Sequence, residues 1–356
     1  MKTRTLATLV VGCATAASVA LSAPSVVETV VPPPPPPIPV EPPTADELAS
    51  RIVPAVVTLV ATDGWTGVAG TGIVLTPDGL VLTNHHVVSG ADEITATSAS
   101  TGLTYDVVVD GYDRAHDIAV VRLGSAQELP VATLAAAEAP PVGSPVTAFG
   151  NADGGGVVVA APGRVVAIGR NVLVRDSADG SRHRLTGMLQ SDAAIRPGDS
   201  GGPLVDAFGA VVGVNTAGAV EDEHTDPAPP TAPEAYAVPI SAAMRIVDQI
   251  RSGTGGGTVH VGPTPLLGVT VTTVRENGED RGAEVLWVSF DSPADTAGLD
   301  IGDVITSFDG KPVVSHGALE TLLMARRPGD TVEIGWRDKT GAPQSASLTV
   351  EAGPVR

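Results

Sequence analysis

The sequence has one cysteine, few aromatic residues and about half as many basic as acidic residues. The cysteine is Cys13, so no disulfide can form within the chain and its domains must be stabilised by packing. Aromatic residues supply 3% of the chain and hydrophobic residues as a whole 43%, which predicts an aliphatic core and favours β structure. The net charge of −19 argues against nucleic acid or anionic lipid as a partner of the folded part, because both are polyanions.

The first 27 residues have the layout of an export segment. Lys2 and Arg4 precede the uncharged stretch Thr5–Val27, which predicts a signal peptide or a membrane anchor. Cleavage after Ser18–Ala20, retention as an anchor and lipidation at Cys13 all stay open. We therefore expect a protein of the periplasm or cell envelope, or a secreted one, that contacts a membrane only through this segment.

Three composition changes divide the rest of the chain. Residues 28–45 include the run Pro32–Pro37 and predict a stiff polyproline spacer. From 46 to 252, short apolar runs alternate with Gly, Asp and Pro turns, which is typical of a barrel or sandwich, and Ser241 is the expected N-cap of a closing helix. Residues 253–258 are glycine-rich and predict a hinge before a second β-rich domain at 259–352.

The most specific motif is Gly198–Pro203, with the sequence GDSGGP. A nucleophilic serine on a tight turn needs small neighbours, so that backbone amides can approach the reacting carbonyl. We predict Ser200 as the nucleophile and the amides of Gly198 and Ser200 as the oxyanion hole.

Two further windows supply partners for Ser200. His86 follows a predicted strand and is the expected general base, while the adjacent His85 is expected to point to the opposite face and to be partly exposed. Asp117 precedes a buried strand and is the expected partner of His86. Asp113 is the alternative, although it is expected to be a solvated loop acid. A metal site at the histidine pair is a weaker interpretation, because no Cys or acidic cluster completes a ligand set. The chain order His, Asp, Ser is that of chymotrypsin-like enzymes.

With these windows, the chain resembles the HtrA/DegP family of serine proteases that carry a PDZ domain. The matching segments are Thr71–Val74, Leu82–Val87, His116–Val120, Gly163–Val166, Leu189–Leu204, Gly213–Thr216 and Tyr236–Ile240. The resemblance implies a mostly β fold, in which a chymotrypsin-like double β-barrel (46–252) precedes an α+β PDZ domain (259–352). It also implies His86, Asp117 and Ser200 as catalytic residues, a homotrimer, and unfolded polypeptides as substrates.

The resemblance also suggests the substrate pocket. The residue six before the nucleophile lies at the base of this pocket in chymotrypsin-like enzymes, and here it is Ala194, followed by Ile195. We expect cleavage after small or medium aliphatic residues. Thr216, Ala217 and Gly218 are expected to pair with the substrate backbone. The family more often has Asn at position 199, and Asp199 is expected to be a solvated turn residue.

The C-terminal region has the pattern of a peptide-binding module. Leu266, Leu267, Gly268 and Val269 resemble the loop with which a PDZ domain holds a peptide C-terminus. A helix starting at Ser292 and a second helix over Ser315–Ala325 support this interpretation. C-terminal peptides are therefore expected partners.

Together these features predict an exported serine endopeptidase that degrades unfolded or damaged envelope proteins without a metal or organic cofactor. Two other functions stay open. One is a peptide-binding, chaperone-like protein with a latent triad, and the other is an esterase on the same fold.

Overall fold

The computed structural model describes residues 41–356 except 65, 137–138, 176–181, 217–233, 277–278, 354 and 356. The predicted export segment and most of the proline spacer lie outside these residues. None of the described helices is both long and apolar enough to cross a membrane.

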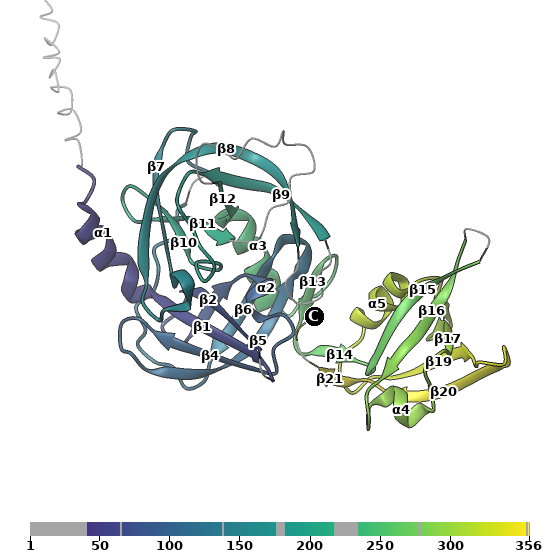
Figure 1. Cartoon of the computed structure of the whole chain (residues 1–356). Coiled ribbons are helices and arrows are strands. Elements are labelled where there is room, and N and C mark those ends of the chain that lie inside the picture. Colours follow the sequence, from purple (N-terminus) through teal and green to yellow (C-terminus); the bar gives the residue numbers. More distant parts are fainter. Residues whose placement is uncertain are drawn as a thin grey trace, which may run out of the picture. The chain divides into compact units, whose positions relative to one another are not determined.

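The first barrel is a sheet of six strands that closes on itself and carries a seventh strand. Its antiparallel order is β5-β4-β1-β2-β3-β6, and β6 pairs back onto β5. β13 pairs with β5 beyond the end of β4 (Figure 1). The strands are β1 (Val56–Asp63), β2 (Thr66–Val74), β3 (Leu80–Thr83), β4 (Glu93–Ser98), β5 (Thr104–Asp113), β6 (Ile118–Leu123) and β13 (Val259–Val261).

The second barrel closes completely in the order β10-β11-β12-β9-β8-β7. Closure pairs every strand on both sides and leaves no exposed edge. Its strands are β7 (Pro145–Gly150), β8 (Val159–Arg175), β9 (Arg182–Ser191), β10 (Pro203–Asp206), β11 (Val211–Thr216) and β12 (Ala235–Pro239).

Helices and short helical turns join the two barrels. α1 (Ala45–Ile52) begins with a capping box between Thr44 and Glu47, and its buried Leu48 and Ile52 join the core. α3 (Ile240–Arg251) packs against β5, β6, β11 and β13. One cluster of buried hydrophobic residues includes members from both barrels and from α3. The N-cap position of this helix is Pro239, two residues before the predicted cap Ser241.

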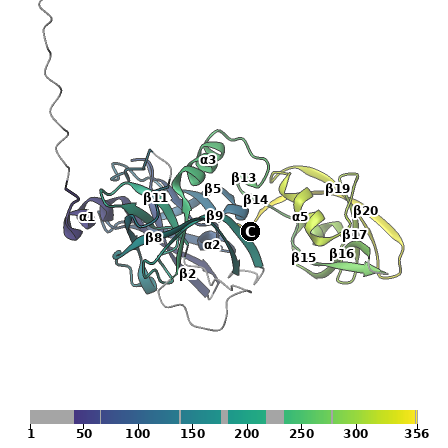
Figure 2. The ribbon, with the colours of Figure 1, turned by 90° about the horizontal axis from the view of Figure 1, so that it is seen from above.

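The C-terminal domain is a small α+β unit, as the sequence predicts. Its main sheet has the order β15-β16-β17-β19-β20, and β14 pairs with β21. Helix α5 lies against β15 and β16 in both views (Figures 1 and 2). The elements are β14 (Thr264–Leu266), β15 (Val269–Glu276), β16 (Glu279–Val288), α4 (Pro293–Ala297), β17 (Val304–Phe308), β18 (Lys311–Pro312), α5 (His316–Met324), β19 (Thr331–Arg337), β20 (Pro343–Thr349) and β21 (Glu351–Gly353).

The strand β13 differs from the prediction that the second domain begins at residue 259. Its three residues pair with β5 of the first barrel. The polypeptide therefore leaves the barrel only after Val261, three residues beyond the predicted hinge at 253–258.

Candidate active site

His86 lies on a single helical turn, α2 (His85–Val88), that follows β3 directly. Its Nδ1 is 2.9 Å from each carboxylate oxygen of Asp117. Its backbone N–H also donates to Oδ1 of Asp117 over 3.0 Å. The imidazole is 19% exposed and the carboxylate 4%. The nearly buried Asp117 therefore orients the His86 ring, which remains partly accessible to solvent.

Asp117 is held in place from several directions. It has a left-handed backbone (φ 55°) at the end of the turn η2 (Arg114–His116). Its carbonyl oxygen accepts from Nδ2 of Asn84 over 2.8 Å, and Oδ2 accepts from the hydroxyl of Thr216 over 3.1 Å. The carboxylate therefore has a fixed orientation toward His86.

The charge on Asp117 follows from these contacts. Burial by itself would raise the pKa of the carboxyl group, but the charge and hydrogen bonds of His86 outweigh it and the pKa is lowered. An ionised carboxylate accepts a hydrogen bond from the Nδ1–H group, which keeps the proton of a neutral imidazole on Nδ1 and the lone pair on Nε2. His86 therefore has the tautomer of a general base.

Ser200 lies on a turn with two glycines in left-handed conformations, Gly198 (φ 97°) and Gly201 (φ 83°). A Cβ atom at Gly201 would overlap the carbonyl oxygen of Thr71 and the hydroxyl of Thr83. The Thr71 N–H donates to the Ser200 carbonyl oxygen over 2.8 Å. The turn of the second barrel thus lies directly against the end of β3, the strand that leads to His86.

The turn before Ser200 is closed by its own polar groups. Asp199 Oδ2 accepts from the Arg196 N–H over 2.8 Å, and the Asp199 N–H donates to the Arg196 carbonyl oxygen over 3.0 Å. The Thr71 hydroxyl donates to the Gly198 carbonyl oxygen over 2.6 Å. A Cβ atom at Gly198 would overlap the carbonyl oxygen of Asn151. The position of the Gly198 amide is therefore set by packing on both sides.

Asp199 itself is buried, which differs from the solvated turn residue that we expected. Its Oδ1 has no hydrogen-bond partner among the described residues. Burial raises the pKa of this carboxyl group more than the Arg196 amide and guanidinium lower it, and the charge of Asp153 adds to the rise. A buried carboxyl group thus lies next to the candidate nucleophile.

The predicted substrate-binding residues have different environments. Ala194 is exposed, whereas Ile195 packs partly against the core of the second barrel. Thr216 is 3% exposed and its hydroxyl contacts Asp117, a role that the sequence reasoning missed. Ala217 and Gly218 lie outside the described residues.

Two expectations near the site are wrong. His85 is 1% exposed, because residues 85–88 form a helical turn and do not continue the strand. Asp113 is also 1% exposed, and it accepts from the backbone N–H of His116 and from the Thr258 hydroxyl. Neither residue is a surface neighbour of the site.

The structure also adds two hydroxyl groups that the sequence reasoning missed, those of Thr71 and Thr83. The Thr83 hydroxyl donates to the Thr71 carbonyl oxygen over 2.7 Å, and Thr71 contacts the Ser200 turn as described above. The only signal in the sequence is that Thr83 precedes the two histidines by two positions. The contact with Thr71 depends on the pairing of β2 with β3, which spacing does not reveal.

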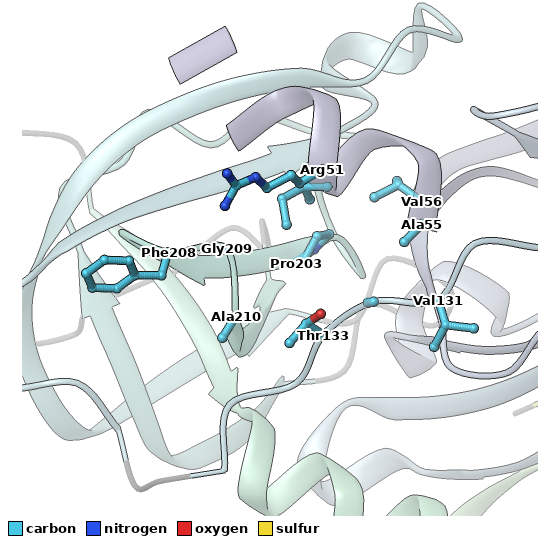
Figure 3. Close-up of a pocket in the computed structure, with 11 residues that line it drawn as sticks. Arg51, Ala55, Val56, Val131, Thr133, Pro203, Phe208, Gly209 and Ala210 are labelled. Carbon is cyan, nitrogen blue, oxygen red and sulfur yellow. The ribbon is translucent and has the colours of Figure 1, made fainter. Parts of the chain in front are cut away.

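A pocket of about 320 Å³ lies away from these residues, between the end of α1 and the β10–β11 turn (Figure 3). Arg51, Phe208 and Pro203 are among the residues that line it, and Pro203 is the last residue of the GDSGGP motif. None of the predicted catalytic residues lines it. Among the described residues, no group of three or more His, Cys, Asp or Glu side chains could hold a metal ion.

The predicted peptide-binding loop lies between β14 and β15. Gly268 has a φ of 80°, and a Cβ atom there would overlap the side chain of Ser292. Leu267 is buried in the core of the domain, and Leu266 and Val269 are partly covered. β15 is the end strand of its sheet in the described part of the chain. Thr273 on this strand contacts Nδ1 of His316, the first residue of α5, over 2.8 Å.

Comparison with known proteins gives the same two domains. Residues 70–214 match a family model described as a trypsin-like peptidase domain, and residues 265–349 match one described as a PDZ domain. A Synechocystis sp. protein, named provisionally as the serine protease HhoA, is 32% identical over 305 residues, which cover 81% of this chain and 71% of that protein. The chain belongs to the HtrA/DegP family of serine proteases.

Other HtrA relatives are longer than this chain. Serine protease PepD of Mycobacterium tuberculosis is 32% identical, with 87% of this chain and 66% of PepD covered. A Rhizobium meliloti protein named "Probable periplasmic serine endoprotease DegP-like" is 33% identical, with 80% and 53% covered. The chain thus spans between half and two thirds of these two curated relatives.

Solved structures that resemble the chain include the serine endoprotease from Yersinia pestis. It is 25% identical, with a TM-score of 0.48, and the match covers 88% of this chain and 100% of that one. The HtrA-type protease AlgW with a tripeptide is 28% identical, also with a TM-score of 0.48, and the match covers 87% and 97%.

Proposed function

We propose that the chain is an exported serine endopeptidase in which His86, Asp117 and Ser200 form the catalytic triad. The observation that carries this proposal is the pair of 2.9 Å distances from Nδ1 of His86 to Asp117, next to the turn of Ser200. His86 takes the proton of the Ser200 hydroxyl as the serine attacks a peptide carbonyl, and then gives it to the leaving amine. Water hydrolyses the acyl-enzyme by the same route.

The amides of Gly198 and Ser200 stabilise the oxyanion of the tetrahedral intermediate. Backbone N–H groups that are already oriented stabilise the developing charge without reorganising, and one such donor contributes about 10² to 10³ in rate. The contacts of Gly198 with Thr71 and Asn151 support this role, because they fix the turn before substrate binds. No metal ion or organic cofactor takes part in these steps.

Unfolded polypeptides are the proposed substrates, and small or medium aliphatic residues precede the cleaved bond. Position 194 is an alanine and carries no acid that could attract a basic side chain. Thr216, Ala217 and Gly218 would present backbone groups to the substrate as an added strand. The names of the DegP-like relatives support a role on envelope proteins.

The PDZ domain is proposed to bind C-terminal peptides through Leu266, Leu267, Gly268 and Val269. β15 has a neighbour on one side only in its described sheet, so a peptide could extend the sheet along it. A preference for an aliphatic C-terminal residue follows from the apolar loop.

The proposed location is the periplasm or cell envelope, reached through the N-terminal export segment. Several DegP-like relatives carry "periplasmic" in their names. N-terminal sequencing of the mature protein would test export. A native mass measurement would test the trimer that the resemblance implies.

A fluorophosphonate probe tests the proposed function directly. We expect the wild-type protein to be labelled and to cleave an unfolded casein, and Ser200→Ala to do neither. No labelling across pH and with peptide activators would overturn the protease proposal and leave a peptide-binding protein with a latent triad. Hydrolysis of a short-chain ester with casein left intact would instead identify an esterase.

A further inference from the structure

The strand that follows the protease domain's last helix belongs to the sheet that carries His86 and Asp117. β13 pairs with β5 so that His260 lies opposite Tyr112 and Val259 opposite Asp113. Gly111 allows this close approach, because a Cβ atom there would lie 2.5 Å from the His260 carbonyl oxygen. Side chains of this strand therefore lie within reach of the loops that present the two catalytic residues.

A row of three rings, each tilted against the next, connects β13 with the residue before His86. The ring centroids of His260 and Tyr112 are 5.1 Å apart, and those of Tyr112 and His85 are 4.9 Å apart. All three side chains are buried, with exposed fractions of 8%, 2% and 1%. Because His85 is the first residue of α2, the row ends on the helical turn that carries His86.

A second connection ends at Asp117. The Thr258 hydroxyl donates to Oδ2 of Asp113 over 2.8 Å, and Nδ1 of His116 lies 2.7 Å from the same oxygen. Oδ1 of Asp113 accepts from the His116 N–H over 3.2 Å. This carboxylate caps the turn η2, and Asp117 is the next residue after that turn.

The ring of His260 is also fixed from its far side. Nε2 of His260 lies 3.0 Å from the Pro263 carbonyl oxygen, so this nitrogen carries the proton and donates it. The Tyr112 hydroxyl lies 3.2 Å from that of Thr264, which is itself buried. The His260 ring cannot turn, and the Tyr112 side chain cannot move away, without losing a polar contact.

We propose that Thr258 and His260, acting through Asp113 and Tyr112, are positioning residues for the catalytic pair Asp117 and His86. Backbone pairing alone would keep β13 on the sheet, so these side-chain contacts are additional to what the sheet requires. The row of rings that starts at His260 ends beside His86, and the hydrogen bonds that start at Thr258 end beside Asp117. This inference rests on the proposed catalytic roles of His86 and Asp117.

Four variants of the full-length protein test the proposal. His260→Ala removes a ring from the row of three and His260→Phe keeps one, while Thr258→Val removes the hydroxyl and Thr258→Ser keeps it. Active sites are counted with the fluorophosphonate probe, and kcat and KM are measured on an aliphatic peptide over a range of pH. A second measurement is the NMR resonance of the His86 Nδ1 proton, which needs no turnover.

We expect His260→Ala and Thr258→Val to lower kcat by about tenfold each, which corresponds to about 1.4 kcal/mol, with KM changed less than twofold. The pH at which activity rises, and the Nδ1 proton resonance, should shift in both variants. His260→Phe and Thr258→Ser should recover most of the lost rate.

The proposal is overturned if His260→Ala and Thr258→Val only lower the melting temperature. In that case both variants, measured well below that temperature, would keep the wild-type kcat, pH profile and proton resonance. It is also overturned if His260→Phe is as slow as His260→Ala. Failure of the proposed function looks different, because then the wild-type protein itself would not react with the probe.

Discussion

Thr216 of the second barrel donates its hydroxyl to Asp117 of the first barrel over 3.1 Å. The oxygen that accepts it, Oδ2, also lies 2.9 Å from Nδ1 of His86. A charged acceptor with two donors is better compensated for its burial than one with a single donor. The bond also links the barrels at the point where residues from both must act together.

Replacing Thr216 by valine should therefore slow the reaction without weakening substrate binding. Loss of one hydrogen bond to a buried charge costs about 1.5 to 3 kcal/mol, and we expect kcat to fall by about tenfold or more. Thr216→Ser keeps the hydroxyl and is the matched control. Equal rates in the two variants, measured per titrated active site, would contradict the role of the hydroxyl.

Replacing Asp117 by asparagine should have a larger effect. The amide cannot hold the proton on Nδ1 of His86 as the carboxylate does, so the imidazole is left in the wrong tautomer. In the serine-protease template, this change costs about 10⁴ in kcat. We expect a loss of about 10³ to 10⁴ at neutral pH, and retention of more than a tenth of the activity would exclude Asp117 as the orienting acid.

Asp199 predicts a pH dependence of stability. Its pKa is raised above 3.8 in the folded protein, so the fold favours the neutral acid, and the stabilisation present at low pH is lost as the pH rises through the folded value. Asp199→Asn is uncharged throughout. The variant should gain stability relative to the wild type above pH 4, by about 1 to 3 kcal/mol. Urea unfolding between pH 4 and 7 measures this difference. A free energy of unfolding that changes with pH by the same amount in both proteins would contradict the prediction.

Gly198 and Gly143 provide a matched pair for testing the nucleophile turn. Both have a positive φ, 97° and 89°, so alanine brings a similar backbone cost of about 1 to 2 kcal/mol at each. Only Gly198 also has a carbonyl oxygen, that of Asn151, in the space of the new Cβ, whereas no atom lies within 4 Å at Gly143. Gly198→Ala should abolish probe labelling and Gly143→Ala should retain it.

The peptide-binding loop has a similar pair in Gly268 and Gly310. Their φ values are 80° and 73°, but a Cβ atom overlaps Ser292 only at Gly268. Gly268→Ala should weaken binding of a peptide with an aliphatic C-terminus by about tenfold or more, since the loop must move. Gly310→Ala should bind it as the wild type does. Fluorescence anisotropy with a labelled peptide measures both.

Local patterns predicted the helix starts of the second domain well. The two helices were expected to start at Ser292 and at about Ser315. In the structure both serines are N-caps, and each accepts from the backbone N–H three residues later, that of Asp295 and that of Ala318. Such caps depend on side chains close in sequence. The mostly β fold was also predictable, because short aliphatic runs between turn residues are typical of strands in a barrel or sandwich.

Contacts between distant segments were not predictable in this way. His85 was expected on an extended strand, but residues 85–88 turn into a helix that buries its ring against Tyr112. Asp113 looked like a loop acid, because its partner Thr258 lies 145 residues further on. Motif spacing identifies candidate catalytic residues, whereas their neighbours depend on which strands pair.

The place of β13 in the chain also affects the order in which the enzyme is completed. A chain exported from its N-terminus delivers His86, Asp117 and Ser200 before Thr258 and His260. During this interval Ser200 is already present, but β13, the strand that pairs with β5 of the first barrel, is not. On the proposed positioning role, the site reaches its full rate only after Thr258 and His260 have been delivered and β13 has paired with β5.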